Sequence, residues 1–231
     1  MSARVDVSHV RDWIFDLDNT LYRADAEFFS QIDRKMAAFV SRYLALQPDE
    51  ARMLQKQYLV EYGTTLSGLM SVHGMDPAEF LDYVHDVELH MLAPDPTLRA
   101  GIAALPGRKF IFTNGSKGHA RNVGTHLDLF DLFDGVFGVE DVDYTPKPKA
   151  RAYEIFRDAF GIDTHRAAFF EDSVRNLEVP KRMGMATVLV TGEADWSGEP
   201  EVVRPASGET VVADWVDAVT DDLAGWLAAN T

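Results

Sequence analysis

Two aspartates, Asp16 and Asp18, follow the apolar stretch 13–15 near the beginning of this 231-residue chain. The β-branched and aromatic residues of that stretch are typical of a buried strand. A spacing of two residues along a strand places both carboxylates on one face. Neighbouring carboxylates repel each other unless a cation lies between them. The pattern predicts a strand end that holds a hard metal ion, with one carboxylate free to react; the alternative is a surface strand end with two solvated acids.

A second polar group, Thr113-Asn114-Gly115, follows the predicted strand 109–113. The threonine hydroxyl and the backbone amides after it could hold a phosphate group at the beginning of the next helix. The same three residues also make a good turn, so this group alone does not identify a site.

Lys147 stands between two prolines just before the predicted helix 150–160. The prolines restrict the backbone on both sides of this lysine and so fix the direction of its side chain. A lysine in this place can neutralise phosphate oxygens or stabilise the charge of a nucleophile. We expect Lys149, in contrast, to lie in the first turn of the helix and to face solvent.

Acidic residues also end the predicted strand 167–171, where Glu171 is followed by Asp172 and, further on, by Asn176. Acids at the carboxyl end of a buried strand are costly unless they have a function. Oxygen ligands of this kind, together with water and phosphate, favour Mg²⁺. An alternative is that Asp172 or Ser173 caps the following helix.

In chain order these groups resemble the four motifs of the haloacid dehalogenase (HAD) superfamily, in particular its Asp-x-Asp phosphatases. The matching residues are Asp16, Asp18, Asn19, Thr20, Leu21, Thr113, Asn114, Lys147, Pro148, Tyr153 and Asp172. Glu171 departs from the Gly-Asp and Asp-Asp forms that are commonest in the fourth motif. Dehalogenases of the superfamily lack an acid at the position of Asp18, which favours phosphoryl transfer here.

The resemblance implies a role for each residue. Asp16 would be the nucleophile, and Asp18 the acid that protonates the leaving group and then the base that activates water. Mg²⁺ would be bound by Asp16, Asp172 and the main-chain carbonyl of Asp18. The phosphate contacts would be Thr113, Asn114, Gly115 and Lys147, and the residues that orient the metal ligands would be Glu171 and Asn176.

The order of the predicted elements indicates the fold. Residues 97–190 alternate between helices and strands, which is the pattern of an α/β protein with a doubly wound parallel sheet. Residues 24–92 are helix-like with few strand signals, which predicts a set of four helices. The resemblance therefore implies a Rossmann-like HAD core, residues 1–22 and 94–231, with a small helical cap domain, residues 23–93, inserted after the first strand.

At the C-terminal end of the core, the sequence predicts a surface loop over residues 192–208. A last short strand is then predicted over residues 211–216, and a closing helix over residues 218–229.

Composition restricts the possible partners and settings. The net charge of −15 argues against nucleic-acid polymers and anionic membranes as partners. The absence of cysteine excludes disulfides, thiolate zinc sites and a cysteine nucleophile. Neither a signal peptide nor an apolar stretch of about 18 residues is recognisable, so we expect a cytoplasmic protein.

The substrate would be selected by the cap, which would cover the site. The sequence most resembles the pyrimidine 5′-nucleotidase subgroup, which implies a nucleoside monophosphate as the substrate. A sugar-phosphate or phosphoglycolate-type phosphatase is the alternative within the same chemistry. A phosphomutase, a 2-haloacid dehalogenase and a non-catalytic nucleotide-binding module are further alternatives, and the oligomeric state is not predicted.

Overall fold

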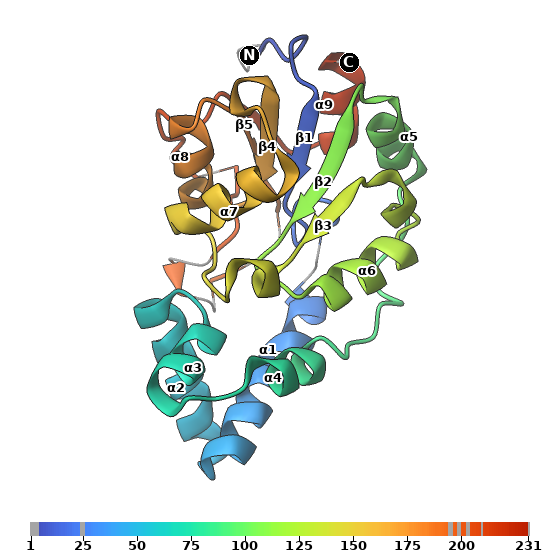
Figure 1. Ribbon diagram of the computed structural model, residues 1–231. Coiled ribbons are helices and arrows are strands. Elements are labelled where there is room, and N and C mark those ends of the chain that lie inside the picture. Colours follow the sequence, from blue (N-terminus) through green and yellow to red (C-terminus); the bar gives the residue numbers. More distant parts are fainter. Residues whose placement is uncertain are drawn as a thin grey trace. The chain divides into compact units, whose positions relative to one another are not determined.

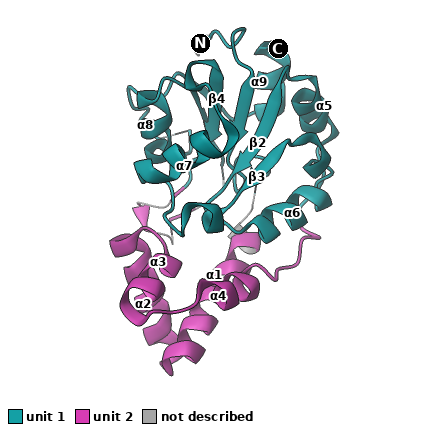
Figure 2. Ribbon diagram, viewed as in Figure 1, with its two compact units in different colours: residues 1–23, 92–194, 205–231 teal, residues 24–91, 195–204 magenta. Residues whose placement is uncertain are grey.

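The computed structural model describes residues 5–23, 26–193, 196–197, 200–201, 204–208 and 210–230. The chain forms two compact units (Figure 2). Unit 1 comprises Met1–Arg23, Leu92–Ala194 and Pro205–Thr231, and unit 2 comprises Ala24–Met91 and Asp195–Arg204. Unit 2 thus contains residues 195–204, which the sequence analysis had placed in the core; part of the loop predicted over residues 192–208 lies outside the described residues.

A parallel sheet forms the centre of unit 1. Its strands are β1 (Asp12–Phe15), β2 (Arg108–Phe112), β3 (Gly135–Phe137), β4 (Ala167–Glu171), β5 (Ala186–Val190) and β6 (Ala218–Thr220), in the spatial order β3-β2-β1-β4-β5-β6. β1 pairs with both β2 and β4, and every strand pair is parallel. The order reverses at β1, as the predicted doubly wound α/β fold requires.

Helices cover both faces of the sheet (Figure 1). One face carries α7 (Ala150–Phe160) and α8 (Val174–Arg182), and the other carries α5 (Pro96–Ala104), α6 (Lys117–His126) and α9 (Leu223–Asn230). Short 3-10 helices, η1 (Phe130–Leu132), η2 (Val139–Val142) and η3 (Thr164–Arg166), lie in the connections. This arrangement follows from right-handed crossovers that run in opposite directions from the middle of the sheet.

Aromatic side chains fill both interfaces between the sheet and its helices. On the α7 side, Phe112 stacks on Phe156 with 4.8 Å between ring centroids. On the α9 side, Phe15 stacks on Phe170 at 4.6 Å, and Phe170 meets the edge of Trp226 at 5.3 Å. Because successive strand residues point to opposite faces, these two layers also determine on which side the polar residues after each strand emerge.

The C-terminal elements differ from the sequence prediction. No strand forms over residues 211–216, and Val211 is 87% exposed. Instead β6 begins at Ala218, in the range predicted as a helix, and α9 begins only at Leu223. The backbone of β6 pairs with β5, so tertiary pairing outweighs the helical composition of this segment.

Unit 2 is helical. Its helices are α1 (Ala26–Leu44), α2 (Pro48–Tyr62), α3 (Thr65–His73) and α4 (Pro77–Val84). Gly63 and Gly74 adopt left-handed conformations at the ends of α2 and α3, with φ of 87° and 63°. Asp76 caps α4 by accepting a hydrogen bond from the amide of Ala78, and Pro77 follows at the first helical position.

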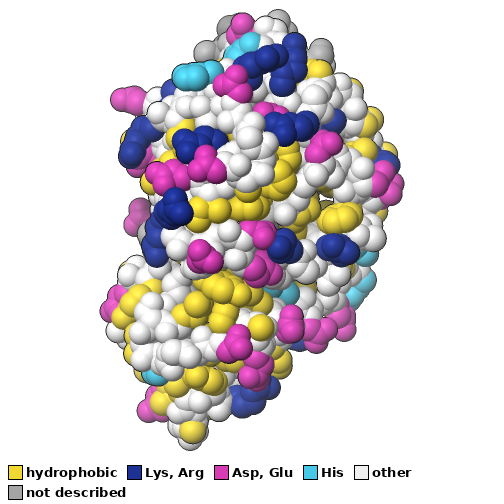
Figure 3. Space-filling view, viewed as in Figure 1, with side chains coloured by type: hydrophobic (Ala, Val, Ile, Leu, Met, Phe, Trp, Pro, Cys, Tyr) yellow, Lys and Arg dark blue, Asp and Glu magenta, His cyan; other side chains and the backbone are white. Residues whose placement is uncertain are grey.

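Charged side chains of both signs lie on the surface (Figure 3). On the face shown in Figure 3, Asp and Glu side chains are interspersed with Lys and Arg. Among the described residues, no helix is both long and apolar enough to cross a membrane.

Candidate active site

The candidate site lies at the carboxyl ends of β1 and β4, where the strand order reverses and where open α/β sheets bind ligands. Asp16 directly follows β1, and its amide donates a hydrogen bond to the Phe170 carbonyl at 2.9 Å. Glu171 is the last residue of β4, and Asp172 follows it. Backbone pairing of β1 with β4 therefore brings these three acids together from distant parts of the chain.

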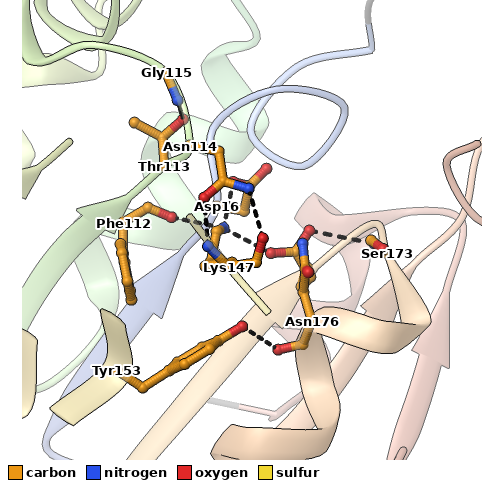
Figure 4. Close-up of polar contacts among 10 residues, drawn as sticks. Asp16, Phe112, Thr113, Asn114, Gly115, Lys147, Tyr153, Ser173 and Asn176 are labelled. Atoms are coloured by element: carbon orange, nitrogen blue, oxygen red, sulfur yellow. Dashed lines mark hydrogen bonds and ion pairs between the residues drawn. The ribbon is translucent and has the colours of Figure 1, made fainter. Parts of the chain in front are cut away.

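Lys147 connects the two strand ends. Its ammonium group donates to Asp16 Oδ1 at 2.7 Å, to Glu171 Oε2 at 2.7 Å and to the Phe112 carbonyl at 2.9 Å (Figure 4). These contacts account for all three hydrogens of an ammonium group. Lys147 is only 1% exposed, whereas Lys149 is exposed at the beginning of α7, as expected.

Three carboxylates form a potential metal site. One oxygen from each of Asp16, Glu171 and Asp172 lies within 4.8 Å of the other two. A single lysine neutralises only part of the charge of three carboxylates. The sequence analysis expected Asp16 and Asp172 as metal ligands and Glu171 as a residue that orients them. The structure brings the Glu171 carboxylate into the same cluster.

The excess of negative charge shifts the pKa values of the residues in this cluster. Burial, and then the charge of Glu171, raise the pKa of Asp16 to about 8, although Lys147 opposes this. Burial and Glu171 likewise raise the pKa of Asp172 well above its usual range. Burial also disfavours the charged form of Glu171, but the charge of Lys147 and side-chain hydrogen bonds from Asp172, Lys147 and Asn176 together outweigh it, so the pKa of Glu171 is lowered. The same carboxylates raise the pKa of Lys147 against the effect of burial.

Asn176 supplies a second sign that a ligand belongs here. It lies in α8 and is 7% exposed, and its Oδ1 atom is buried without a hydrogen-bond partner. The Tyr153 hydroxyl donates to the Asn176 carbonyl at 2.7 Å, which fixes the first turn of α8. An unpartnered oxygen and an excess of carboxylate charge are both satisfied by a divalent cation, so this site fits one.

Asn114 is hydrogen-bonded to the backbone of Lys147. Its Oδ1 accepts a hydrogen bond from the Lys147 amide at 2.8 Å, and its Nδ2 donates to the Lys147 carbonyl at 3.1 Å (Figure 4). The side chain thus pairs with the backbone of Lys147 through both of its polar ends. The sequence analysis expected a phosphate contact for Asn114; the second hydrogen of its Nδ2 group remains for such a contact, which stays a prediction.

Thr113 and Gly115 interact with each other. The Gly115 amide donates to Thr113 Oγ1 at 2.9 Å, which makes this hydroxyl oxygen an acceptor and leaves its proton to be donated elsewhere. A Cβ atom on Gly115 would lie 3.3 Å from Thr113 Oγ1 and 3.8 Å from Asp18 Oδ2. Thr113 and Gly115 are therefore close to the predicted acid–base residue.

Asp18 lies in a turn rather than in the strand. β1 ends at Phe15, and the Leu17 carbonyl accepts the Leu21 amide at 3.0 Å across a turn in which Asn19 has a φ of 60°. The argument from strand spacing therefore does not apply to Asp18. Its carboxylate is absent from the three-carboxylate cluster among the described residues.

Two residues that the sequence analysis did not connect with Asp18 hold its carboxylate. The Tyr22 hydroxyl donates to Asp18 Oδ1, and His119 Nε2 lies 3.1 Å from the same oxygen. Burial and the Asp18 charge raise the pKa of Tyr22 well above its usual value, so the phenol keeps its proton. Tyr22 is four residues from Asp18 across a recognisable turn, whereas nothing local in the sequence relates His119 to it.

The fold defines the class of protein as an α/β protein with a doubly wound parallel sheet and a second, helical unit. Residues 13–184, which exceed half of the chain, match the family of haloacid dehalogenase-like hydrolases. The chain therefore belongs to this family.

Individual relatives are more distant. Phosphate metabolism protein 8 of Saccharomyces cerevisiae is 28% identical over an alignment of 193 residues, which covers 77% of this chain. The aligned part spans only 60% of the length of that curated relative.

Solved structures share the fold. The L-2-haloacid dehalogenase of Xanthobacter autotrophicus has a TM-score of 0.58 and 17% identity, with 95% of this chain and 97% of that chain covered. A HAD phosphatase from Thermococcus onnurineus has a TM-score of 0.57 and 20% identity, with 81% of this chain and 90% of that chain covered.

Proposed function

We propose that this protein is a phosphatase that hydrolyses phosphomonoesters through an aspartyl-phosphate on Asp16. The observation that carries the proposal is the meeting of Asp16, Lys147, Glu171 and Asp172 at one sheet edge, with a second aspartate, Asp18, held nearby by two donors. Halide displacement needs no proton for its leaving group. A positioned second acid is useful where an alkoxide must be protonated.

The proposed reaction has two steps. In the first, an oxygen of Asp16 attacks phosphorus, the bond to the ester oxygen breaks, and Asp18 gives its proton to the departing oxygen. In the second, Asp18 takes a proton from water, and the resulting hydroxide attacks the phosphoryl group. The bond between phosphorus and the Asp16 oxygen then breaks, which releases phosphate and restores the Asp16 carboxylate. The name of the yeast relative, Phosphate metabolism protein 8, supports phosphate chemistry over dehalogenation.

The residues around Asp16 prepare the charge for this reaction. Lys147 donates to Asp16 Oδ1 and thereby stabilises its ionised form, which is the nucleophile. Thr113 can donate its hydroxyl proton to a phosphoryl oxygen, because its own oxygen already accepts the Gly115 amide.

A divalent cation completes the proposed site. Asp16, Glu171 and Asp172 would bind it, and we propose Mg²⁺ because all candidate ligands are oxygens. When bound, Mg²⁺ would balance the excess carboxylate charge and withdraw charge from the phosphoryl oxygens.

We further propose a nucleoside monophosphate, in particular a pyrimidine 5′-nucleotide, as the leaving-group class, on the resemblance of the sequence motifs. A panel of nucleotides, sugar phosphates and phosphoglycolate, ranked by kcat/KM, tests this choice. A higher value for sugar phosphates or phosphoglycolate would reassign the substrate and leave the chemistry unchanged.

The decisive experiment for the chemistry is release of phosphate from p-nitrophenyl phosphate with Mg²⁺ and with EDTA. Turnover that requires the metal supports a phosphatase. Nucleotide binding without turnover of any ester would indicate a binding module, and release of chloride from 2-chloropropionate without phosphatase activity would indicate a dehalogenase.

A further inference from the structure

The carboxylate of Asp18 is held by a tyrosine and a histidine, whereas those of Asp16 and Glu171 are held by Lys147. Tyr22 and His119 both contact the same oxygen, Oδ1. Two donors on one oxygen fix the rotation of the carboxylate about its Cβ–Cγ bond. An acid that must deliver a proton to a particular oxygen needs such a fixed direction.

The Tyr22 contact comes from the local chain path. Asn19 adopts a left-handed conformation in the turn after β1, and the backbones of Asp18 and Tyr22 form an isolated parallel bridge. Both residues therefore lie side by side, and the short tether holds the phenol next to the carboxylate. Tyr22 is 8% exposed, so water does not readily replace its hydrogen bond.

The His119 contact comes from α6, which follows Thr113 and Gly115. Ser116 caps this helix, and its Oγ accepts the His119 amide at 3.1 Å. The cap fixes the first turn and with it the direction of the His119 side chain. His119 is 2% exposed, which is a costly position for an imidazole unless its ring nitrogen has a partner.

His119 also lies beside the expected phosphate contacts. A Cβ atom on Gly115 would lie 3.4 Å from His119 Cδ2 and 3.3 Å from Thr113 Oγ1. The histidine thus fixes Asp18 relative to the loop that would receive the phosphoryl group. A histidine with only a structural role would not need to lie beside both Asp18 and this loop.

We propose that His119, together with Tyr22, is a positioning residue that aims the Asp18 carboxylate at the leaving oxygen of the substrate. This inference rests on the proposed phosphatase function. It assigns to α6 a role in leaving-group protonation, beyond a role in phosphate binding.

The dependence of the rate on the leaving group provides the test, because a good leaving group departs without a proton. Ribose 5-phosphate, with an alkoxide leaving group, is compared with 2,4-dinitrophenyl phosphate through kcat/KM. For His119→Leu we expect a loss of about 10- to 100-fold with the alkyl ester, the range for general acid catalysis that is weakened but not removed. With the dinitrophenyl ester the loss should be less than about threefold, since no proton is needed.

Three variants complete the design. Asp18→Asn should give the same selective pattern with a larger loss, and His119→Gln should recover part of the alkyl-ester rate because its amide can donate to Asp18. His126→Gln is the matched control, because His126 is an exposed histidine on the same helix whose Nε2 lies 2.8 Å from the Leu92 carbonyl oxygen, away from Asp18. It should leave both rates unchanged.

The ratio of the two rates is insensitive to the amount of folded enzyme, since both esters are assayed on one preparation. Equal losses with both esters in His119→Leu would overturn the proposal and leave His119 a purely structural residue. Equal losses in Asp18→Asn would overturn it as well, because Asp18 would then not be the acid. If the wild-type protein hydrolysed neither of the two esters, this result would instead refute the phosphatase function itself, and the inference with it.

Discussion

At the scale of single residues, Asp16 has the most direct role, because it is the proposed nucleophile. Replacing it with Asn keeps the size of the side chain and removes the nucleophile, so we expect kcat to fall by at least about 1,000-fold, as for other catalytic nucleophiles. The fold should persist, since a neutral side chain reduces the charge imbalance beside Glu171. Phosphate release and circular dichroism measure the two effects.

Asp158→Asn is the matched control, because Asp158 is an exposed aspartate of α7 in the same unit. It should keep full activity. Substantial turnover by Asp16→Asn would rule out an aspartyl-phosphate on this residue.

The two hydrogen bonds between the Asn114 side chain and the Lys147 backbone give a second prediction. In Asn114→Ala the amide and the carbonyl of Lys147 both lose their partner, and the ammonium becomes free to shift away from Asp16. Small misplacements of catalytic groups cost about 100-fold, so we expect kcat to fall by about 10- to 100-fold. The Ki of inorganic phosphate should change by less than about threefold if Asn114 makes no phosphate contact.

A large rise in that Ki with a nearly constant kcat would instead support the direct phosphate contact expected from the sequence. Thr113→Val is the matched comparison, because it removes a hydroxyl that can donate to a phosphoryl oxygen. It should weaken phosphate binding.

How far the site was predictable depends on which contacts are local in the sequence. Asp16, Lys147 and Asp172 stand next to strand ends or prolines, so their placement follows from the order of the elements. The partnership of His119 with Asp18 spans 101 residues and depends on the register of α6 against the turn after β1. No local pattern contains that register.

At the scale of elements, the turn between α5 and β2 determines how β2 joins β1. Gly107 has a φ of 87°, and a Cβ atom there would lie 2.2 Å from the Arg11 carbonyl oxygen. The same oxygen accepts the Arg108 amide at 2.8 Å, so it belongs to the beginning of the pairing of β1 with β2. Gly107→Ala should therefore lower the free energy of unfolding by about 3 kcal/mol or more, from left-handed strain and overpacking together.

Gly161→Ala separates these two causes. Gly161 also has a positive φ, 58°, but no atom lies within 4 Å of its added Cβ. Urea denaturation should show a loss of only about 1–2 kcal/mol for this variant, from conformational strain alone. Equal losses for both variants would mean that the close approach to Arg11 is relieved without cost.

The end of the chain shows why elements can be misplaced from the sequence. The valines at 211 and 212 suggest a strand, yet both are exposed. The three residues of β6 are too few to show a period, and they precede the leucine- and alanine-rich α9. Their strand conformation follows from pairing with β5, which is information about the tertiary structure.

At the scale of the whole molecule, the site acids make stability depend on metal and pH. In the metal-free protein Asp16 ionises near pH 8, whereas the unfolded chain ionises it near its ordinary pKa of 3.8. Between these values the folded state holds a proton that the unfolded state has released, so rising pH favours unfolding. Asp172 acts in the same direction. The lowered pKa of Glu171 gives a stabilising contribution that is fully present above its ordinary pKa of 4.5 and adds no further pH dependence there.

We therefore expect the melting temperature in EDTA to fall as the pH rises from 5 to about 8. Excess Mg²⁺ should raise it most at the upper end, because ligand binding to the folded state stabilises that state and requires ionised carboxylates. Asp16→Asn should show a weaker pH dependence in EDTA, since one of the two raised carboxyl groups is gone. Thermal melts of both proteins at several pH values provide the measurement, and a melting temperature in EDTA that rises over this range would show that the three carboxylates are not held together in the folded protein.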